Sequence, residues 1–205
     1  MFDIAKFFAE VRNGPGAGKG ILGPKLEPNE VEGCEAILKA MAGLPISHCA
    51  YSLATGFKET NGTMQPVEEA YWIRNAAAWR KRNLRYWPHH GRGYVQLTWA
   101  ENYARADAEL AAAGLIKAGE LIANPDLAMR PDIAAFIMRR GMVEGWFAAS
   151  KDGRRHTLAR HLPDPVGKIE QFESGRRIIN GTDCAHQIAV YAMQFQTALI
   201  TGGWA

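Results

Sequence analysis

The sequence predicts a mainly α-helical fold: a single-domain helical bundle with one small β-hairpin and a groove for a substrate. Apolar residues recur at helical spacing over most of the chain, and the alternation typical of strands is nearly absent. Apolar side chains make up 47% of the 205 residues and charged ones 22%, which supports one core and excludes a disordered chain. No repeat or long linker divides the sequence, so residues 1–205 are predicted to form one domain.

Five segments carry an apolar stripe at helical spacing. The first has Asp3 near its start, a residue type that favours the beginning of a helix. The third runs directly into Glu59, and Gly202 and Gly203 stop the last. We therefore predict helices over residues 2–11, 31–41, 46–57, 132–142 and 183–199.

Shorter signals lie between these stripes. The segment from Gly93 to Thr98 is the best candidate for a strand of the hairpin. Thr98-x-x-Glu101 matches a capping box, which predicts a further helix running through Tyr103. The glycine-rich segment 13–24 does not match a phosphate-binding loop and has no strand before it, so it is predicted to be a surface loop between two helices.

Cysteine usage and charge narrow the class of protein. Cys34, Cys49 and Cys184 have no metal-ligand spacing, so no metal site is expected. Cys34 and Cys49 fall on apolar helix faces, where we expect buried free thiols, with a single disulfide as the alternative. The net charge of +3 suits an anionic polymer, but it does not distinguish an acidic glycan from a nucleic acid as the partner.

The amino-terminal residues lack the basic and apolar regions of a signal peptide, and no stretch approaches the roughly 18 apolar residues of a membrane span. We therefore expect synthesis in the cytoplasm without a signal peptide and no membrane insertion.

One cluster of carboxylates has a pattern suited to acid–base chemistry. Glu59 ends an apolar helix before a polar, glycine-containing turn, which would hold it partly removed from water beside a cleft. Glu68 and Glu69 follow about ten residues later and offer a second carboxylate from another element. Hydrolysis of a glycosidic bond needs such a pair, because one protonates the leaving oxygen and the other activates water. Solvated charges at helix ends are the alternative.

The segment from Tyr86 to Tyr103 concentrates aromatic, amide and hydroxyl side chains, a mixture suited to sugars. Its candidate sugar-binding residues are Trp87, Arg92, Gln96, Thr98, Asn102 and Tyr103.

The run from Arg74 to Arg92 contains six Lys or Arg residues and no acid. A solvated basic face is the simplest interpretation, and single-stranded nucleic acid is a second. No recognised binding motif accompanies the run, so we expect no nucleic-acid partner.

Three motifs in order resemble glycoside hydrolase family 19, which includes plant-type chitinases and chitinase-like lysozymes of phage endolysins. They are Lys58-Glu59-Thr60, the Gly-Arg-Gly-Tyr-Val-Gln-Leu-Thr segment ending at Thr98, and Ile178-Ile179-Asn180-Gly181. Asn124-Pro125-Asp126-Leu127 resembles the segment that the family has between the last two. The resemblance spans roughly residues 45 to 185.

The resemblance implies a lysozyme-like α+β fold, with Glu59 as the general acid and no cofactor. Gln96, Thr98, Asn102 and Asn180 would line the sugar subsites, and Thr98 would help to position the attacking water. Glu69 is our choice for the base, and Glu68 remains an alternative. Lys58 stands where the family has a histidine, and we expect its side chain to face away from Glu59.

The amino-terminal segment and Thr63-Met64-Gln65-Pro66 are similar to the phage-type members, which favours peptidoglycan over chitin. The expected activity is inverting hydrolysis of β-1,4 bonds by a monomer that reaches the cell wall after holin-type release or other delivery. A chitinase and an inactive glycan-binding protein are the alternatives.

Overall fold

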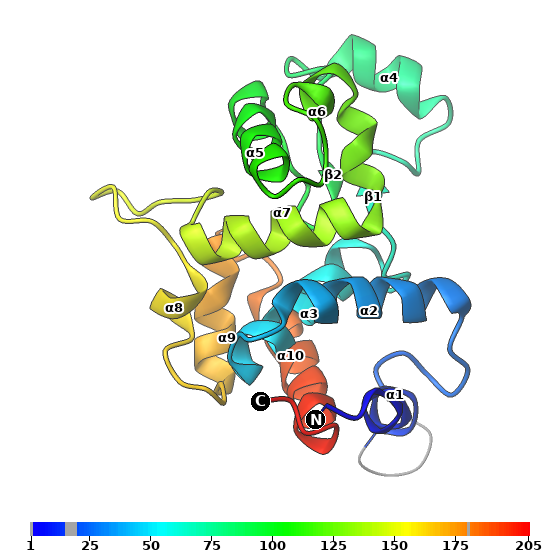
Figure 1. The fold of residues 1–205 in the computed structure, drawn as a ribbon, viewed down its shortest axis with the longest axis vertical. Coiled ribbons are helices and arrows are strands. Elements are labelled where there is room, and N and C mark those ends of the chain that lie inside the picture. The colour runs from blue at the N-terminus through cyan, green and yellow to red at the C-terminus, as the bar shows by residue number, and fades with distance from the viewer. Residues whose placement is uncertain (1, 15–19, 180) are drawn as a thin grey trace.

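The computed structural model describes residues 2–14, 20–179 and 181–205 (Figure 1). Helices dominate it, and two short strands form the one named sheet among these residues. The α-helices are α1 (Ile4–Asn13), α2 (Pro28–Met41), α3 (Ile46–Glu59), α4 (Ala76–Asn83), α5 (Ala100–Ala112), α6 (Glu120–Ala123), α7 (Pro131–Glu144), α8 (Leu158–His161), α9 (Ile169–Gly175) and α10 (Ala185–Thr201). The 3-10 helices are η1 (Pro125–Met129) and η2 (Arg176–Ile178), and the strands are β1 (Val67–Glu68) and β2 (Arg92–Gly93).

The five helices predicted from apolar stripes are confirmed as α1, α2, α3, α7 and α10. Asp3 caps α1, since its Oδ1 accepts hydrogen bonds of 3.1 Å from the backbone N–H groups of Ala5 and Lys6. α4, α6, α8 and α9 were not predicted. α4 is rich in alanine and basic residues and buries only Arg80, so it has no apolar stripe from which a helix could be predicted.

The core lies where α3 packs against α10, with α1 and α9 against the other sides of α10 and α2 against α7 (Figure 1). Fully buried side chains such as Leu53 and Phe195 fill this space. Cys34 and Cys49 are buried there as predicted, and burial raises the pKa of both thiols. α2 approaches the loop after α3 so closely that a Cβ on Gly33 would lie 1.7 Å from the Met64 carbonyl oxygen. The core therefore fixes the carboxyl end of α3, where Glu59 lies.

The sheet differs from the predicted hairpin. β1 and β2 pair antiparallel with Glu68 opposite Arg92, but the long segment containing α4 joins them instead of a tight turn. The predicted strand from Gly93 to Thr98 turns back on itself instead, because the N–H groups of Arg92 and Leu97 each donate to the other's carbonyl, at 3.2 and 2.8 Å. Figure 1 shows this sheet with α4, α5 and α6 beyond α7, on the side away from the termini.

The predicted capping box at Thr98 is wrong. The Thr98 hydroxyl donates to the Gln96 carbonyl at 2.7 Å, and α5 begins at Ala100 with Trp99 at the N-cap position. The Asn102 side-chain amide donates to the Thr98 carbonyl at 2.9 Å and fastens the loop to the first turn of the helix. The side chains of Thr98 and Asn102 therefore both stabilise the loop before α5.

Within the described part of the chain, no helix combines the length and the apolar character needed to cross a bilayer.

Candidate active site

Glu59 is the last residue of α3, and its side chain is 20% exposed. Its Oε1 accepts a hydrogen bond from Nη1 of Arg176 at 2.7 Å. The turn that follows is held by the Thr60 hydroxyl, which accepts from the Met64 N–H at 3.0 Å. The partial burial predicted for this carboxylate is confirmed.

Arg176 connects Glu59 to the third sequence motif. Its side chain is buried, and its Nε donates to the carbonyl oxygen of Asp183 at 2.9 Å. Arg176 and Asp183, which lie on either side of this motif, are therefore linked to the carboxyl end of α3. Asn180 itself lies outside the described residues. The sequence interpretation missed Arg176, because nothing in its local pattern distinguishes it from the neighbouring Arg177.

Lys58 lines a cavity that Glu59 does not line. That cavity, of about 180 Å³, is formed with residues of α10 such as Gln187 and Tyr191. Within the described chain Lys58 makes no ion pair with Glu59. This position agrees with the expectation that the lysine faces away.

Glu68 lies between two arginines and a histidine. Its Oε1 accepts from Nε2 of His90 at 2.8 Å and lies 3.3 Å from Nη2 of Arg92, while Oε2 contacts Arg80. Desolvation lowers the pKa of His90, with the charges of Arg92 and Arg80 adding to the effect, so its imidazole is neutral near pH 7 and donates a hydrogen bond to Glu68 through Nε2. The Glu68 side chain is 26% exposed, and these contacts hold it in one orientation.

Glu69 has a different environment. Its Oε1 accepts from the Tyr86 hydroxyl at 2.8 Å and its Oε2 from the Gly91 N–H at 2.9 Å. Desolvation, followed by the bond to Glu69, raises the pKa of Tyr86 to about 12, so the phenol remains a donor. Glu69 thus fastens the segment before β2 to the end of β1. Glu68 ends β1 and Glu69 begins the turn after it, and the two carboxylates have different partners.

A cavity of about 460 Å³ lies beside Glu68. It brings together three of the residues predicted from the sequence, namely Glu68, Trp87 and Arg92. Glu59, Glu69 and Thr98 are not among the residues that line it. The full lining is Glu68, Ala77, Ala78, Arg80, Lys81, Trp87, His90, Arg92 and Asp126.

The loop before α5 carries the predicted polar residues. Gln96 donates from Nε2 to the Val67 carbonyl of β1 at 3.0 Å, which ties this loop to the strand that bears Glu68. Gln96 and Trp99 have φ angles of 51° and 75°, a conformation that residues other than glycine adopt at an energetic cost. Such strain is concentrated at functional sites, and it flanks Thr98 on both sides.

Tyr103 is a correction to the sequence interpretation. Its side chain is fully buried, its hydroxyl donates to the His90 carbonyl at 2.9 Å and it accepts from Nη1 of Arg92 at 3.1 Å. A sugar therefore has no surface of Tyr103 to contact, and the residue supports Arg92 and His90 from beneath. Arg92 is also largely buried and pairs with Glu68 and Asp126. Its predicted contact with a sugar is therefore limited to the part of the side chain that lines the cavity.

Three groups of candidate residues therefore exist: Glu59 with Arg176, the cavity around Glu68, and the loop around Thr98. Within the described residues, no three His, Cys, Asp or Glu side chains gather as ligands of a metal ion.

Solved structures share this arrangement of helices. Chitinase C from Streptomyces griseus superposes with a TM-score of 0.54 and 18% sequence identity, over 98% of this chain and 77% of that one. A bacterial family 19 chitinase superposes with a TM-score of 0.52 and 21% identity, over 98% and 94% of the two chains. No protein-family model and no curated protein sequence matches the chain. The resemblance inferred from the motifs is thus confirmed at the level of the fold, which is the lysozyme-like fold of family 19 chitinases.

Proposed function

We propose that this protein is a glycoside hydrolase that cleaves β-1,4 bonds of bacterial peptidoglycan with inversion. The observation that carries the proposal is the position of Glu59, partly buried at the end of α3 and held by Arg176, in a chain with the fold of family 19 chitinases. A glycan hydrolase needs a carboxyl to protonate the leaving oxygen, and Glu59 is the candidate for that role.

Glu59 acts as the general acid in this proposal. Arg176 holds its Oε1, and no hydrogen bond to Oε2 occurs within the described residues, so Oε2 is the oxygen that would carry the proton for the glycosidic oxygen. Fixing one oxygen restricts the rotation of the carboxyl, which reduces the entropy lost when the transition state forms.

Glu68 is the better candidate for the second carboxylate, in place of our first choice, Glu69. Glu68 lines the cavity, whereas both oxygens of Glu69 are occupied by Tyr86 and by the backbone of Gly91. Glu68 would hold the attacking water and stabilise positive charge on the sugar. Inversion requires a separation of roughly 6.5–9.5 Å between the two carboxyl groups, with room for the water. Thr98 remains the candidate for a further contact with that water.

Peptidoglycan is the proposed substrate because the exposed cations around α4 suit an acidic glycan, and because Thr63-Met64-Gln65-Pro66 resembles the phage-type members. Chitin is the second candidate, since the two solved structures named above are chitinases. We propose that the protein acts at the cell wall after release through a holin or by another delivery route.

Product analysis tests the proposal. Wild-type protein is incubated with purified peptidoglycan and, separately, with chitin hexamer, and new reducing ends are counted while their anomeric form is followed by NMR. We expect faster release from peptidoglycan and products that first appear as the α-anomer. Faster cleavage of the hexamer would assign a chitinase, and wall binding without new reducing ends would assign an inactive glycan-binding protein.

A further inference from the structure

The cations around α4 divide into two groups by burial. Arg80 faces inward, is buried and contacts Glu68. Arg74, Lys81, Arg82 and Arg85 are exposed, and none of them pairs with a carboxylate within the described residues. Exposed cations that are not paired with carboxylates attract an anionic ligand.

Lys81 is the exposed cation that also lines the cavity beside Glu68. The other charges of that cavity are compensated, since Arg80 and Arg92 contact Glu68 and Arg92 pairs with Asp126 at 2.9 Å. The charge of Lys81 therefore has no counter-ion among the described residues lining this space.

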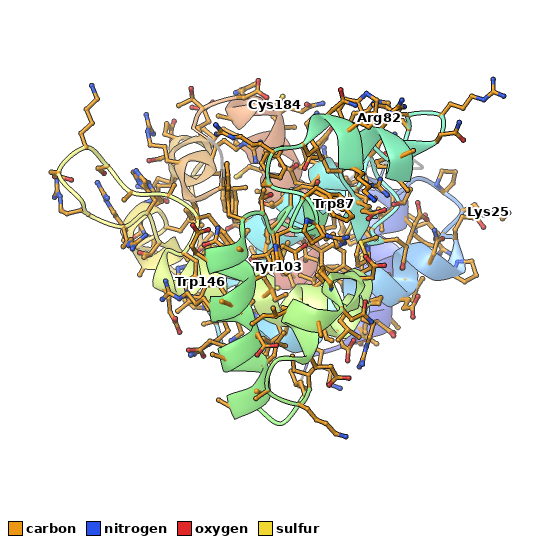
Figure 2. The ribbon with its side chains drawn as sticks, turned by 90° about the horizontal axis from the view of Figure 1, so that it is seen from above. Lys25, Arg82, Trp87, Tyr103, Trp146 and Cys184 are labelled. Carbon is orange, nitrogen blue, oxygen red and sulfur yellow. The ribbon has the colours of Figure 1, made fainter. Side chains whose placement is uncertain are left out.

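Trp87 positions the Lys81 ammonium. Its ring is 44% exposed, and Nζ of Lys81 lies 5.3 Å from the ring centroid, within the range of a cation–π contact. Figure 2 looks onto this side of the molecule and shows Trp87 beneath α4, with Arg82 on the helix itself. The cavity is thus lined by an aromatic ring with a positive charge held over it.

A second pair repeats this arrangement nearby. The guanidinium of Arg85 lies 5.0 Å from the ring centroid of Trp99, which is 40% exposed, and Trp99 also packs against Tyr86. Aromatic faces bind the C–H surface of a pyranose ring, and an adjacent cation binds a carboxylate on that sugar. Chitin has no such carboxylate, whereas peptidoglycan carries carboxylates on its peptide stems, or on the lactyl group of a sugar that has no stem.

We infer that Lys81, held over Trp87, binds a carboxylate of the peptidoglycan substituents and so selects this acidic glycan over chitin. The inference rests on the proposed function, since it names the substrate class of the same site. Lys81 is a specificity-determining residue that takes no part in bond cleavage.

A binding experiment separates this inference from the question of catalysis. The Glu59→Gln variant is titrated with a soluble peptidoglycan fragment of two disaccharides with their peptide stems, and with the neutral chitin tetramer, while tryptophan fluorescence is recorded. Lys81→Met is added to this background, and Arg82→Met, an exposed α4 cation that does not line the cavity, serves as the matched control.

We expect Lys81→Met to weaken binding of the acidic fragment about three- to fivefold, the size of one exposed ion pair, and to leave chitin tetramer binding unchanged. Arg82→Met should change both affinities less than twofold. Equal weakening for both ligands, or none for the acidic fragment, would overturn the inference, as would tighter binding of a single-stranded oligonucleotide than of the fragment. If the fragment shows the expected pattern but wild-type protein cleaves neither glycan, the proposed function fails and the binding inference stands.

Discussion

Nη1 of Arg176 lies 2.7 Å from Oε1 of Glu59, and the same guanidinium donates through Nε to the Asp183 carbonyl at 2.9 Å. One buried side chain thus links the end of α3 to the start of α10. Because the contact joins segments that are distant in the sequence, the geometry of Glu59 depends on the packing of α10 against α3.

Replacing Arg176 tests whether this link positions the acid. We expect Arg176→Met to lower kcat about 10- to 100-fold, since a loosely held carboxyl loses part of the benefit of orientation. Arg176→Lys should recover part of the activity, and Arg177→Met, at an exposed neighbouring arginine, should leave kcat unchanged. A wild-type kcat in Arg176→Met would show that Arg176 does not position the acid.

The two neighbouring glutamates can be distinguished by matched substitutions. Glu68→Gln should lower kcat at least 100-fold with little change in KM, because it removes a charge that faces the cavity. Glu69→Gln should lower the melting temperature more than kcat, since its carboxylate holds Tyr86 and Gly91. The assignment would be reversed if Glu69→Gln caused the larger loss of kcat in a protein with an unchanged melting temperature.

Acid should destabilise the fold through a pair of histidines. Nε2 of His161 lies 2.8 Å from Nδ1 of His156, and its Nδ1 lies 2.8 Å from the Ser174 hydroxyl. Desolvation lowers the pKa of His161 to about 4, and the charges of His156, Arg160 and Arg177 act in the same direction. Because the unfolded chain takes up this proton below about pH 6.5 and the folded chain only near pH 4, stability is complete above pH 6.5 and is lost as the pH falls through this window.

The measurement is the melting temperature between pH 7.5 and pH 4.5. We expect it to fall steadily below pH 6.5 in the wild type, and to fall less in His161→Gln, which lacks the titrating group. Parallel curves for the two proteins would show that His161 does not supply the dependence.

Gly33 tests the close packing of α2 on the loop after Glu59. A Cβ at this position would meet the Met64 carbonyl oxygen at 1.7 Å, and backbone atoms must shift to relieve the overlap. We expect Gly33→Ala to lower the free energy of unfolding by about 1–3 kcal/mol, measured by urea denaturation. Glu35→Ala, at an exposed position of the same helix, should stay within about 0.5 kcal/mol of the wild type. Equal stability of the Gly33→Ala protein would contradict the packing.

The sequence predicted the parts of the fold that local periodicity encodes. The stripes of α1, α2, α3, α7 and α10 are visible in single segments, because each helix buries one face against the core. α4 could not be found in this way, since its alanines and basic residues leave no apolar face. The Thr98 signal predicted a cap because the local pattern contains no information about the competing carbonyl of Gln96.

The candidate site was predictable only where motifs specify it. Glu59 could be identified from the order of the motifs, and the sequence offered Glu69 as the base with Glu68 as the alternative. The choice between these two depends on which carboxylate faces the cavity, which the sequence does not contain. Arg176 was missed because its contact with Glu59 joins residues that are far apart in the sequence. Tyr103 was expected to contact a sugar, because an aromatic residue in a polar segment can be either a sugar contact or a core residue.

The activity of Glu59→Gln on purified peptidoglycan tests the central claim most directly. The glutamine keeps the shape of the side chain and an oxygen for Arg176, but it has no proton to give to the glycosidic oxygen. We predict that release of reducing ends falls roughly 100- to 10,000-fold while the melting temperature stays near that of the wild type. A variant that cleaves peptidoglycan at the wild-type rate would contradict the assignment of Glu59 as the acid.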